Sequence, residues 1–182
     1  MTPSLYVESH RIGLVDLVRA VAAQGGAVGW LAVPEPHEVH TWLDGLLASG
    51  AQLVVAERDG TVLACGALRT HAAPVLRILG EVTKVMTHPA HRGQGAARAV
   101  MELLLDVAQR DGLEVLMLAC RGNNHGAQAL YAGLGFVVTG RRPDVIAVGD
   151  ERFDEVLMHR DLRVGTQGLV RHGSRREGPG RT

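Results

Sequence analysis

Residues 85–97 read Val-Met-Thr-His-Pro-Ala-His-Arg-Gly-Gln-Gly-Ala-Ala, and this stretch decides the fold because a strand passes through it into a glycine-rich turn that opens a helix. Such a turn points several backbone N–H groups outward at a helix N-terminus, where the helix dipole also favours negative charge. Glycine is needed because a Cβ would block the close approach of a ligand. The stretch therefore predicts a pyrophosphate site.

Two better-known phosphate motifs do not fit this turn. A dinucleotide-binding fold requires three spaced glycines after the first strand and an acidic residue about 20 residues later. A P-loop requires a Gly-Lys-Ser/Thr sequence. Neither pattern is present, and two glycines before a helix are also compatible with a simple loop.

On both sides of this stretch, the spacing of apolar residues alternates between strand and helix periods. The run at 113–119 is nearly all apolar, as expected of a central strand covered on both faces. The element order βααβββαβαββ predicts an α/β (α+β) fold, a twisted mixed central sheet with helices on both faces. Strands are expected at 5–7, 53–56, 62–68, 81–87, 113–119, 136–140 and 155–160, and helices at about 14–25, 38–47, 95–110 and 127–134.

Length and composition predict one domain. The chain has 182 residues, 46% of them hydrophobic, which suffices for one substantial core but not for two ordinary domains. We expect the domain to span residues 1–162. Residues 163–182 lose hydrophobic periodicity and are rich in glycine and arginine, which predicts a disordered basic tail.

Charge and cysteine usage favour a small partner in the cytoplasm. The 19 basic residues balance the 19 acidic residues, so no overall charge favours nucleic acid or an anionic membrane as a partner. The N-terminus lacks a secretory signal pattern, and no apolar run is long enough to span a bilayer. Cys65 and Cys120 lie in apolar runs rather than at metal-ligand spacing, so we expect buried free thiols and no metal.

Two ordered motifs resemble those of the GNAT acyltransferases. The first, Arg/Gln-x-x-Gly-x-Gly/Ala after a strand, is matched by Arg92, Gly95 and Ala97. The second, Asn-x-x-Ala-x-x-Leu-Tyr followed by Leu-Gly-Phe, is matched by Asn124, Ala127, Leu130, Tyr131 and residues 134–136. The resemblance covers residues 53–162.

Within that superfamily, residues 80–88 and 131–144 look most like the tabtoxin-resistance acetyltransferases, which acetylate the amine of an amino-acid-like toxin. Residues 119–121 and 144–146 depart from that group.

The resemblance implies that acetyl-CoA binds in a V-shaped opening between two central strands. The amides of about residues 94–97 would hold the pyrophosphate, the main chain of Val85 and Thr87 would pair with the pantetheine arm, and Asn124 would hydrogen-bond that arm. The implied cofactor-binding residues are Val85, Met86, Thr87, Arg92, Gly93, Gln94, Gly95, Ala96, Ala97, Asn124 and Ala127.

The same resemblance implies two catalytic residues. Tyr131 would protonate the departing thiolate, and its structural alternative is a buried core tyrosine. Glu81 would remove a proton from the attacking ammonium, directly or through water, and its alternative is a strand-end carboxylate or a partner of Lys84.

Lys84 lies inside a predicted central strand, where an unpaired charge is costly. We expect a structural ion pair in preference to a contact with a substrate carboxylate. Cys120 raises the alternative of a covalent acyl-cysteine route, but nothing near it in sequence would activate the thiol.

Taken together, the motifs predict an N-acetyltransferase that transfers an acetyl group to a primary amine of a small amino-acid-like metabolite or antibiotic, by direct attack in a ternary complex. The alternatives are acetylation of a protein or peptide N-terminus and a non-catalytic acyl-CoA binding module. The resemblance also implies that the chain can form a homodimer.

Overall fold

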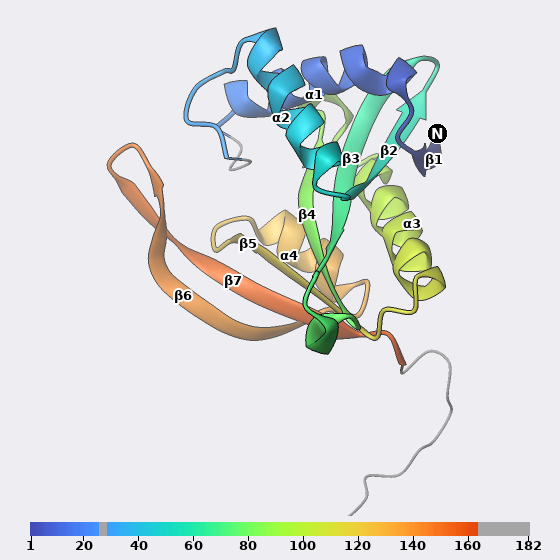
Figure 1. Ribbon diagram of the computed structural model, residues 1–182. Helices are drawn as coiled ribbons and strands as arrows, with labels where there is room; N and C mark the ends of the chain where they lie inside the picture. The colour runs from blue at the N-terminus through green and yellow to red at the C-terminus, as the bar shows by residue number, and fades with distance from the viewer. Residues whose placement is uncertain (26–28, 164–182) are drawn as a thin grey trace, which may run out of the picture.

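The computed structural model describes residues 1–25 and 29–163 (Figure 1). Apart from Arg163, the predicted basic tail lies outside the described residues. The observed element order within the described ranges matches the sequence prediction, from a first strand through two helices to a final strand pair. In these ranges, no helix combines the length and the apolar character needed to cross a membrane.

A seven-stranded sheet forms the centre of the molecule, in the order β1-β2-β3-β4-β5-β7-β6. Only the central β4–β5 pair is parallel, so the sheet is mixed as predicted. The strands span Thr2–Leu5 (β1), Gln52–Arg58 (β2), Thr61–Thr70 (β3), Leu79–Thr87 (β4), Val115–Arg121 (β5), Val137–Val148 (β6) and Glu151–Asp161 (β7).

The helices cover both faces of this sheet, which confirms the predicted layers (Figure 1). Helices α1 (Arg11–Ala23) and α2 (Pro36–Ala48) pack on one face, and α3 (Ala96–Arg110) and α4 (His125–Ala132) pack on the other. Each face has its own apolar core. The sheet therefore separates two packed layers.

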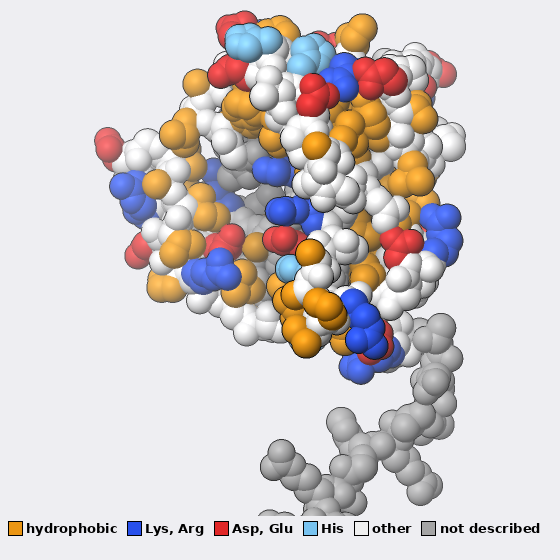
Figure 2. Space-filling view, viewed as in Figure 1, with side chains coloured by type: hydrophobic (Ala, Val, Ile, Leu, Met, Phe, Trp, Pro, Cys, Tyr) orange, Lys and Arg blue, Asp and Glu red, His pale blue; other side chains and the backbone are white. Residues whose placement is uncertain are grey.

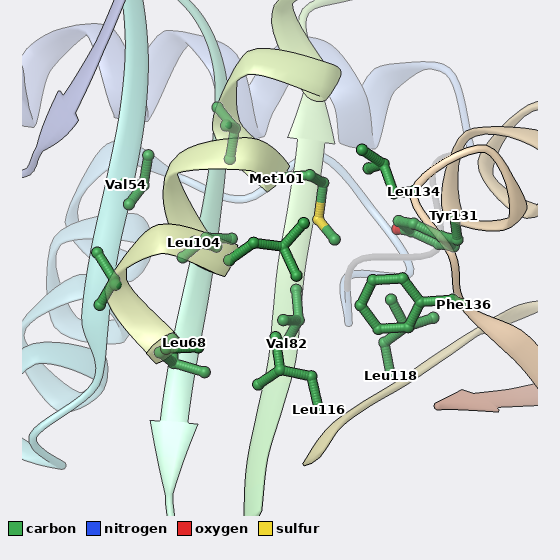
Figure 3. Close-up of a cluster of buried hydrophobic side chains, with 14 of the residues drawn as sticks. Val54, Leu68, Val82, Met101, Leu104, Leu116, Leu118, Tyr131, Leu134 and Phe136 are labelled. Carbon is green, nitrogen blue, oxygen red and sulfur yellow. The ribbon is translucent and has the colours of Figure 1, made fainter. Parts of the chain in front are cut away.

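Helix α3 packs closely against the sheet because of one glycine. A Cβ added to Gly66 of β3 would lie 2.9 Å from Cγ1 of Val100 and 3.0 Å from Cδ1 of Leu104. Both side chains belong to the apolar stripe of α3, and both are fully buried in the core shown in Figure 3. Helix α3 therefore lies directly against β3.

The edge strands differ from their predicted bounds. Strands β6 and β7 form a long hairpin, whereas the sequence predicts a strand only to residue 140, because Arg141, Arg142 and Pro143 interrupt the apolar pattern. Most side chains of β6 are exposed, so backbone pairing with β7 extends it rather than burial. Strand β1 begins earlier than predicted and shares only Leu5 with residues 5–7.

The prediction that β5 is covered on both faces is wrong. Leu116 and Leu118 are buried against the α3 and α4 layer, but Met117 on the opposite face is 41% exposed. Helices α1 and α2 cover β2 to β4 and stop short of β5. One face of β5 is therefore not covered by a helix of the described chain.

Candidate active site

The two central strands separate partway along their length. Parallel pairing between β4 and β5 covers Leu79–Val82 on β4, whereas pairing between β4 and β3 continues to Thr87. The backbone from Thr83 to Thr87 therefore has an open edge on the β5 side. The V-shaped opening expected between the central strands is present, and an extended ligand can pair with this edge as a strand would.

A β-bulge lies at the start of this open edge. On β3, Ala67 pairs with Thr83 and Cys65 pairs with Met86, so β4 carries an extra residue in this interval. Lys84 adopts a φ of 56°, which is uncommon for a residue with a Cβ. Its carbonyl accepts a hydrogen bond from Sγ of Cys65 at 3.6 Å. The bulge changes the direction in which the Lys84 side chain leaves the strand.

The glycine-rich turn opens α3 without any side-chain cap. Gly93 and Gly95 have φ values of 75° and 82°, and Gly95 is the N-cap residue. A Cβ at either position would meet no heavy atom of the described residues within 4 Å, so none of them fills the space beside the turn. The first-turn N–H groups of a helix have no intrahelical partner. The turn thus presents unused donors and the positive end of the helix dipole to an anion.

The open edge and the glycine turn border one cavity of about 1000 Å³, which appears as a hollow in Figure 2. Ten of the eleven predicted cofactor-binding residues line it, namely Val85, Met86, Thr87, Arg92, Gly93, Gly95, Ala96, Ala97, Asn124 and Ala127.

Gln94 is the exception among those eleven residues, since it does not line the cavity. Its Oε1 accepts a hydrogen bond from Nη1 of Arg58 at 3.1 Å, and its Nε2 donates to the carbonyl of Ala90 at 3.5 Å. The side chain is therefore tied to the outer surface of the turn.

Asn124 has a structural role that the motif did not reveal. Its Oδ1 accepts a hydrogen bond from the backbone N–H of Ala127 at 3.1 Å, which makes it the N-cap of α4. The amide nitrogen of its side chain has no partner among the described residues, so a ligand in the cavity can use it.

Tyr131 belongs to the core and to the cavity wall at once. It is 5% exposed, and its ring centroid lies 6.1 Å from that of Phe136 (Figure 3). It also lines the cavity, and its hydroxyl makes no hydrogen bond within the described part of the chain. Burial raises the pKa of this phenol above its usual value, so it stays protonated at neutral pH. Tyr131 can therefore be both a buried core residue and the predicted proton donor.

Glu81 also lines the cavity, and it forms no salt bridge among the residues that the structure describes. It lies on β4 opposite Arg69 of β3, so the two side chains leave the same face of the sheet. That face is the one covered by α1 and α2, away from the α3 core that Val82 joins.

The expected structural ion pair of Lys84 is absent from the described chain. The bulge turns its side chain toward α2, where Nζ lies 6.0 Å from the ring centroid of Trp42. A Cβ on Gly29 would lie 3.6 Å from the same nitrogen. Glu81 forms no salt bridge with it. Strand alternation fails as a guide here because the extra residue in the bulge changes the register.

Cys120 is half-buried in the cavity wall rather than buried like Cys65. Burial raises the pKa of its thiol, which disfavours the thiolate that a covalent route requires. No cluster of three or more His, Cys, Asp or Glu side chains in the described ranges could hold a metal ion.

Sequence reasoning missed Arg121, at the end of β5. It lines the cavity, its Nε is buried without a hydrogen-bond partner, and its guanidinium carbon lies 4.8 Å from the ring centroid of Phe153. Alternation along β5 indicates the face of Arg121, which it shares with Met117 and Ala119, but not that this face is open.

The open strand edge that leads to a glycine-rich helix N-terminus defines a class of protein: transferases that hold a long, phosphate-bearing cosubstrate across a split sheet. The chain belongs to the Acetyltransferase (GNAT) family, whose pattern matches residues 19–136.

Known proteins similar to this chain act on different acceptors. The chain is 29% identical over 105 residues, 57% of its length and 60% of the relative, to the L-amino acid N-acyltransferase MnaT of Escherichia coli. Matches to several curated relatives cover at most 60% of their lengths.

Two solved structures share the fold. A ribosomal-protein-alanine N-acetyltransferase from Brucella melitensis superposes with a TM-score of 0.77 at 20% identity, over 88% of this chain and 99% of that one. A phosphinothricin acetyltransferase from Sinorhizobium meliloti in complex with AcCoA superposes with a TM-score of 0.74 at 20% identity, over 88% of this chain and 89% of that one.

Proposed function

We propose that this chain transfers an acetyl group from acetyl-CoA to the primary amine of a small amino-acid-like metabolite or antibiotic in the cytoplasm. One observation carries the proposal: Glu81 and Tyr131 line the same cavity as the open edge of β4 and the glycine turn. A base, an acid and a cosubstrate cradle thus share one space.

The cosubstrate end of the cavity fits acetyl-CoA. The free N–H groups at the start of α3 would hold the pyrophosphate, and Gly93 and Gly95 leave room for it. The backbone of Val85 and Thr87, on the open edge, would pair with the amides of the pantetheine arm. This pairing would direct the thioester toward the bulge at Lys84.

Two side chains would carry the proton transfers at the other end. Glu81 would accept a proton from the ammonium group of the acceptor, directly or through water, which frees the nitrogen lone pair for attack. As the new C–N bond forms and the C–S bond breaks, Tyr131 would donate its proton to the departing sulfur. The second proton that the nitrogen loses would restore the phenol. The phenol suits this task because burial keeps it protonated.

The choice of acceptor rests on two supports. The similar Escherichia coli enzyme is named for L-amino acids, and residues 80–88 resemble the tabtoxin-resistance acetyltransferases. Detoxification of an antibiotic is therefore part of the proposal. The Brucella melitensis protein is named for a ribosomal protein, so a protein N-terminus is the second candidate acceptor. Assembly as a homodimer is a further proposal, which light scattering of the purified chain would test.

A thiol-release assay tests the reaction. The purified chain is mixed with acetyl-CoA and one acceptor from a panel of amino acids, dipeptides, aminoglycosides and protein N-terminal peptides. We expect turnover with amino acids and a large loss of kcat in Glu81→Gln, which keeps the side-chain shape and removes the base. Acetyl-CoA affinity, measured by calorimetry, should be the same in both proteins.

Two results would contradict the proposal. Turnover restricted to the peptides would show that the acceptor is a protein N-terminus and not a small amine. Tight acetyl-CoA binding without consumption of any amine would favour the non-catalytic acyl-CoA binder.

A further inference from the structure

The acceptor end of the cavity carries an excess of positive charge. Arg69 on β3, Lys84 on β4 and Arg121 on β5 line it from three neighbouring strands, and none of the three forms a salt bridge within the described residues. Figure 2 shows Lys and Arg side chains gathered in the hollow.

The acidic side chains of the cavity wall do not balance these cations. In the described part of the chain they are Glu81 and Glu155. The carboxylate of Glu155 already accepts a hydrogen bond from Nη1 of Arg142 at 2.8 Å. Glu155 stands opposite Arg121 on the neighbouring strand, so two carboxylates, one of them shared with Arg142, face three cations of the cavity wall. A partly enclosed space with this imbalance concentrates anions.

Lys84 is the cation best placed to bind an acceptor. It precedes Val85, at the end of the open edge farther from the glycine turn. Thr87 lies three positions further along the strand, roughly 10 Å away at the usual rise of a β-strand. The backbone of Lys84 is therefore remote from the proposed pyrophosphate site and close to where the thioester would end. The phosphates of the cosubstrate would instead lie near Arg92 and Arg98, which line the cavity at the turn.

The backbone at Lys84 supports a functional role. A left-handed φ of 56° costs free energy for a residue with a Cβ, and such strain concentrates at ligand sites. The conformation brings Nζ to the wall formed by Trp42 and Gly29, where no carboxylate of the described chain meets it.

Arg121 adds a second positive charge at the acceptor end of the cavity. The buried Nε of Arg121 lacks a hydrogen-bond partner, which is an unfavourable state for a charged donor. The guanidinium is held over the ring of Phe153 and does not belong to any ion pair in the described ranges. An anionic ligand would reduce the cost of burying this group.

We propose that Lys84 binds the carboxylate of the acceptor, with Arg121 adding positive charge from β5, so that the enzyme selects amines that carry a free carboxylate. This inference rests on the proposed acetyl transfer and narrows its substrate class to zwitterionic amino acids. The carboxylate fixes the acceptor, and its ammonium group is left for Glu81.

Matched acceptors test the role of Lys84. Each common L-amino acid is compared with its α-carboxamide, which keeps the amine and the side chain but has no negative charge. We expect the wild type to favour the amino acid in kcat/KM by about 10- to 100-fold, the effect of one buried charge-assisted contact. Lys84→Met should remove most of this preference, mainly through a higher KM, and leave the carboxamide within about twofold.

Lys84→Arg is the matched variant, because it keeps the charge and carries the same backbone strain as Lys84→Met. It should retain a clear preference for the amino acid. Unchanged acetyl-CoA affinity in both variants would show that they are folded.

The possible contrary results distinguish a failure of the carboxylate subsite from a failure of the proposed acetyl transfer. Equal losses with the amino acid and the carboxamide in Lys84→Met would place the lysine on the thioester or in the fold and overturn the subsite. Turnover of amines by the wild type without the preference would overturn the subsite alone. Absence of turnover with every amine would overturn the proposed function, and the subsite with it.

Discussion

The two ends of the cavity differ in the groups that line them: backbone groups at one end and side chains at the other. At the proposed cosubstrate end, the groups that would meet a ligand are backbone donors and acceptors, supplied by the open edge of β4 and the first turn of α3. At the acceptor end they are side chains, which reach the cavity from β3, β4, β5 and α4. A backbone cradle depends on conformation, whereas a side-chain pocket depends on residue identity.

This difference explains why the cosubstrate end is easier to recognise from the sequence than the acceptor end. A backbone cradle needs only glycine at its strained or crowded positions, so it leaves a short and local sequence motif. A side-chain pocket collects single residues from distant segments, such as Arg69 and Arg121. Substitutions should therefore act on chemistry and acceptor choice at one end, and on acetyl-CoA affinity at the other.

The largest effect is expected for Tyr131→Phe at the acceptor end. Removal of a general acid typically lowers kcat by about 10²- to 10⁴-fold. The phenylalanine ring can keep the packing against Phe136, so the variant should fold and bind acetyl-CoA normally. Thiol release and calorimetry measure the two quantities. A parallel loss of acetyl-CoA affinity would mean that the tyrosine serves the cosubstrate end instead.

The pH dependence sharpens the same assignment. Burial raises the pKa of Tyr131, so its protonated, proton-donating form persists to higher pH than in an exposed tyrosine, which ionises near pH 10. Wild-type kcat should therefore show no decline from phenol ionisation up to about pH 10. The pKa of Tyr131 is higher in the folded chain than in the unfolded chain. Its contribution to the free energy of unfolding is therefore complete below the unfolded pKa and is lost as pH rises toward the folded pKa. Urea unfolding should show this alkaline loss in wild type and less of it in Tyr131→Phe.

A smaller effect, confined to affinity, is expected at the cosubstrate end for Gly95→Val. The residue has a φ of 82°, and the space beside it is where the pyrophosphate would lie. Valine would be strained by about 1–3 kcal/mol in this conformation, and a turn that changes shape to relieve the strain would bind acetyl-CoA roughly 5- to 150-fold more weakly. The control is Gln94→Ala in the same turn. Its side chain lies outside the cavity, so calorimetry should find affinity within about twofold of wild type.

The smallest effect is expected for Cys120→Ala, which tests the direct route. The thiol lines the cavity, but burial raises its pKa and makes it a poor nucleophile. Turnover should remain within about threefold of wild type, since the substitution removes one partly buried atom. Loss of activity together with an acetylated cysteine in the wild-type protein, detected by mass spectrometry, would instead support a covalent intermediate.

The sequence predicted most of the fold because its signals are local. Apolar periodicity placed all four helices of the described chain within a few residues, and the order of elements was correct. The glycine turn and the Asn124 motif located the two segments that frame the cavity. The predicted end of β6 was too early, because backbone pairing with β7 sustains a strand whose own side chains are polar and exposed.

The acceptor end required the tertiary structure. Lys84 was expected in an ion pair, and only the register of β4 against β3 reveals the bulge that turns it toward Trp42. Arg121 gained a place in the site only when β5 proved to be open on one face. Both depend on how strands distant in sequence pair and separate, which is a non-local property.

What the sequence by itself determined is the set of elements and the glycine-rich turn before α3, since helix periodicity, strand alternation and positive-φ glycines are local properties of the chain. The tertiary structure alone decided which charges share the cavity. The physical reason is that β4 and β5 stop pairing after Val82 and Leu118, which opens the cavity between them, while the bulge of β4 against β3 sets the direction of Lys84.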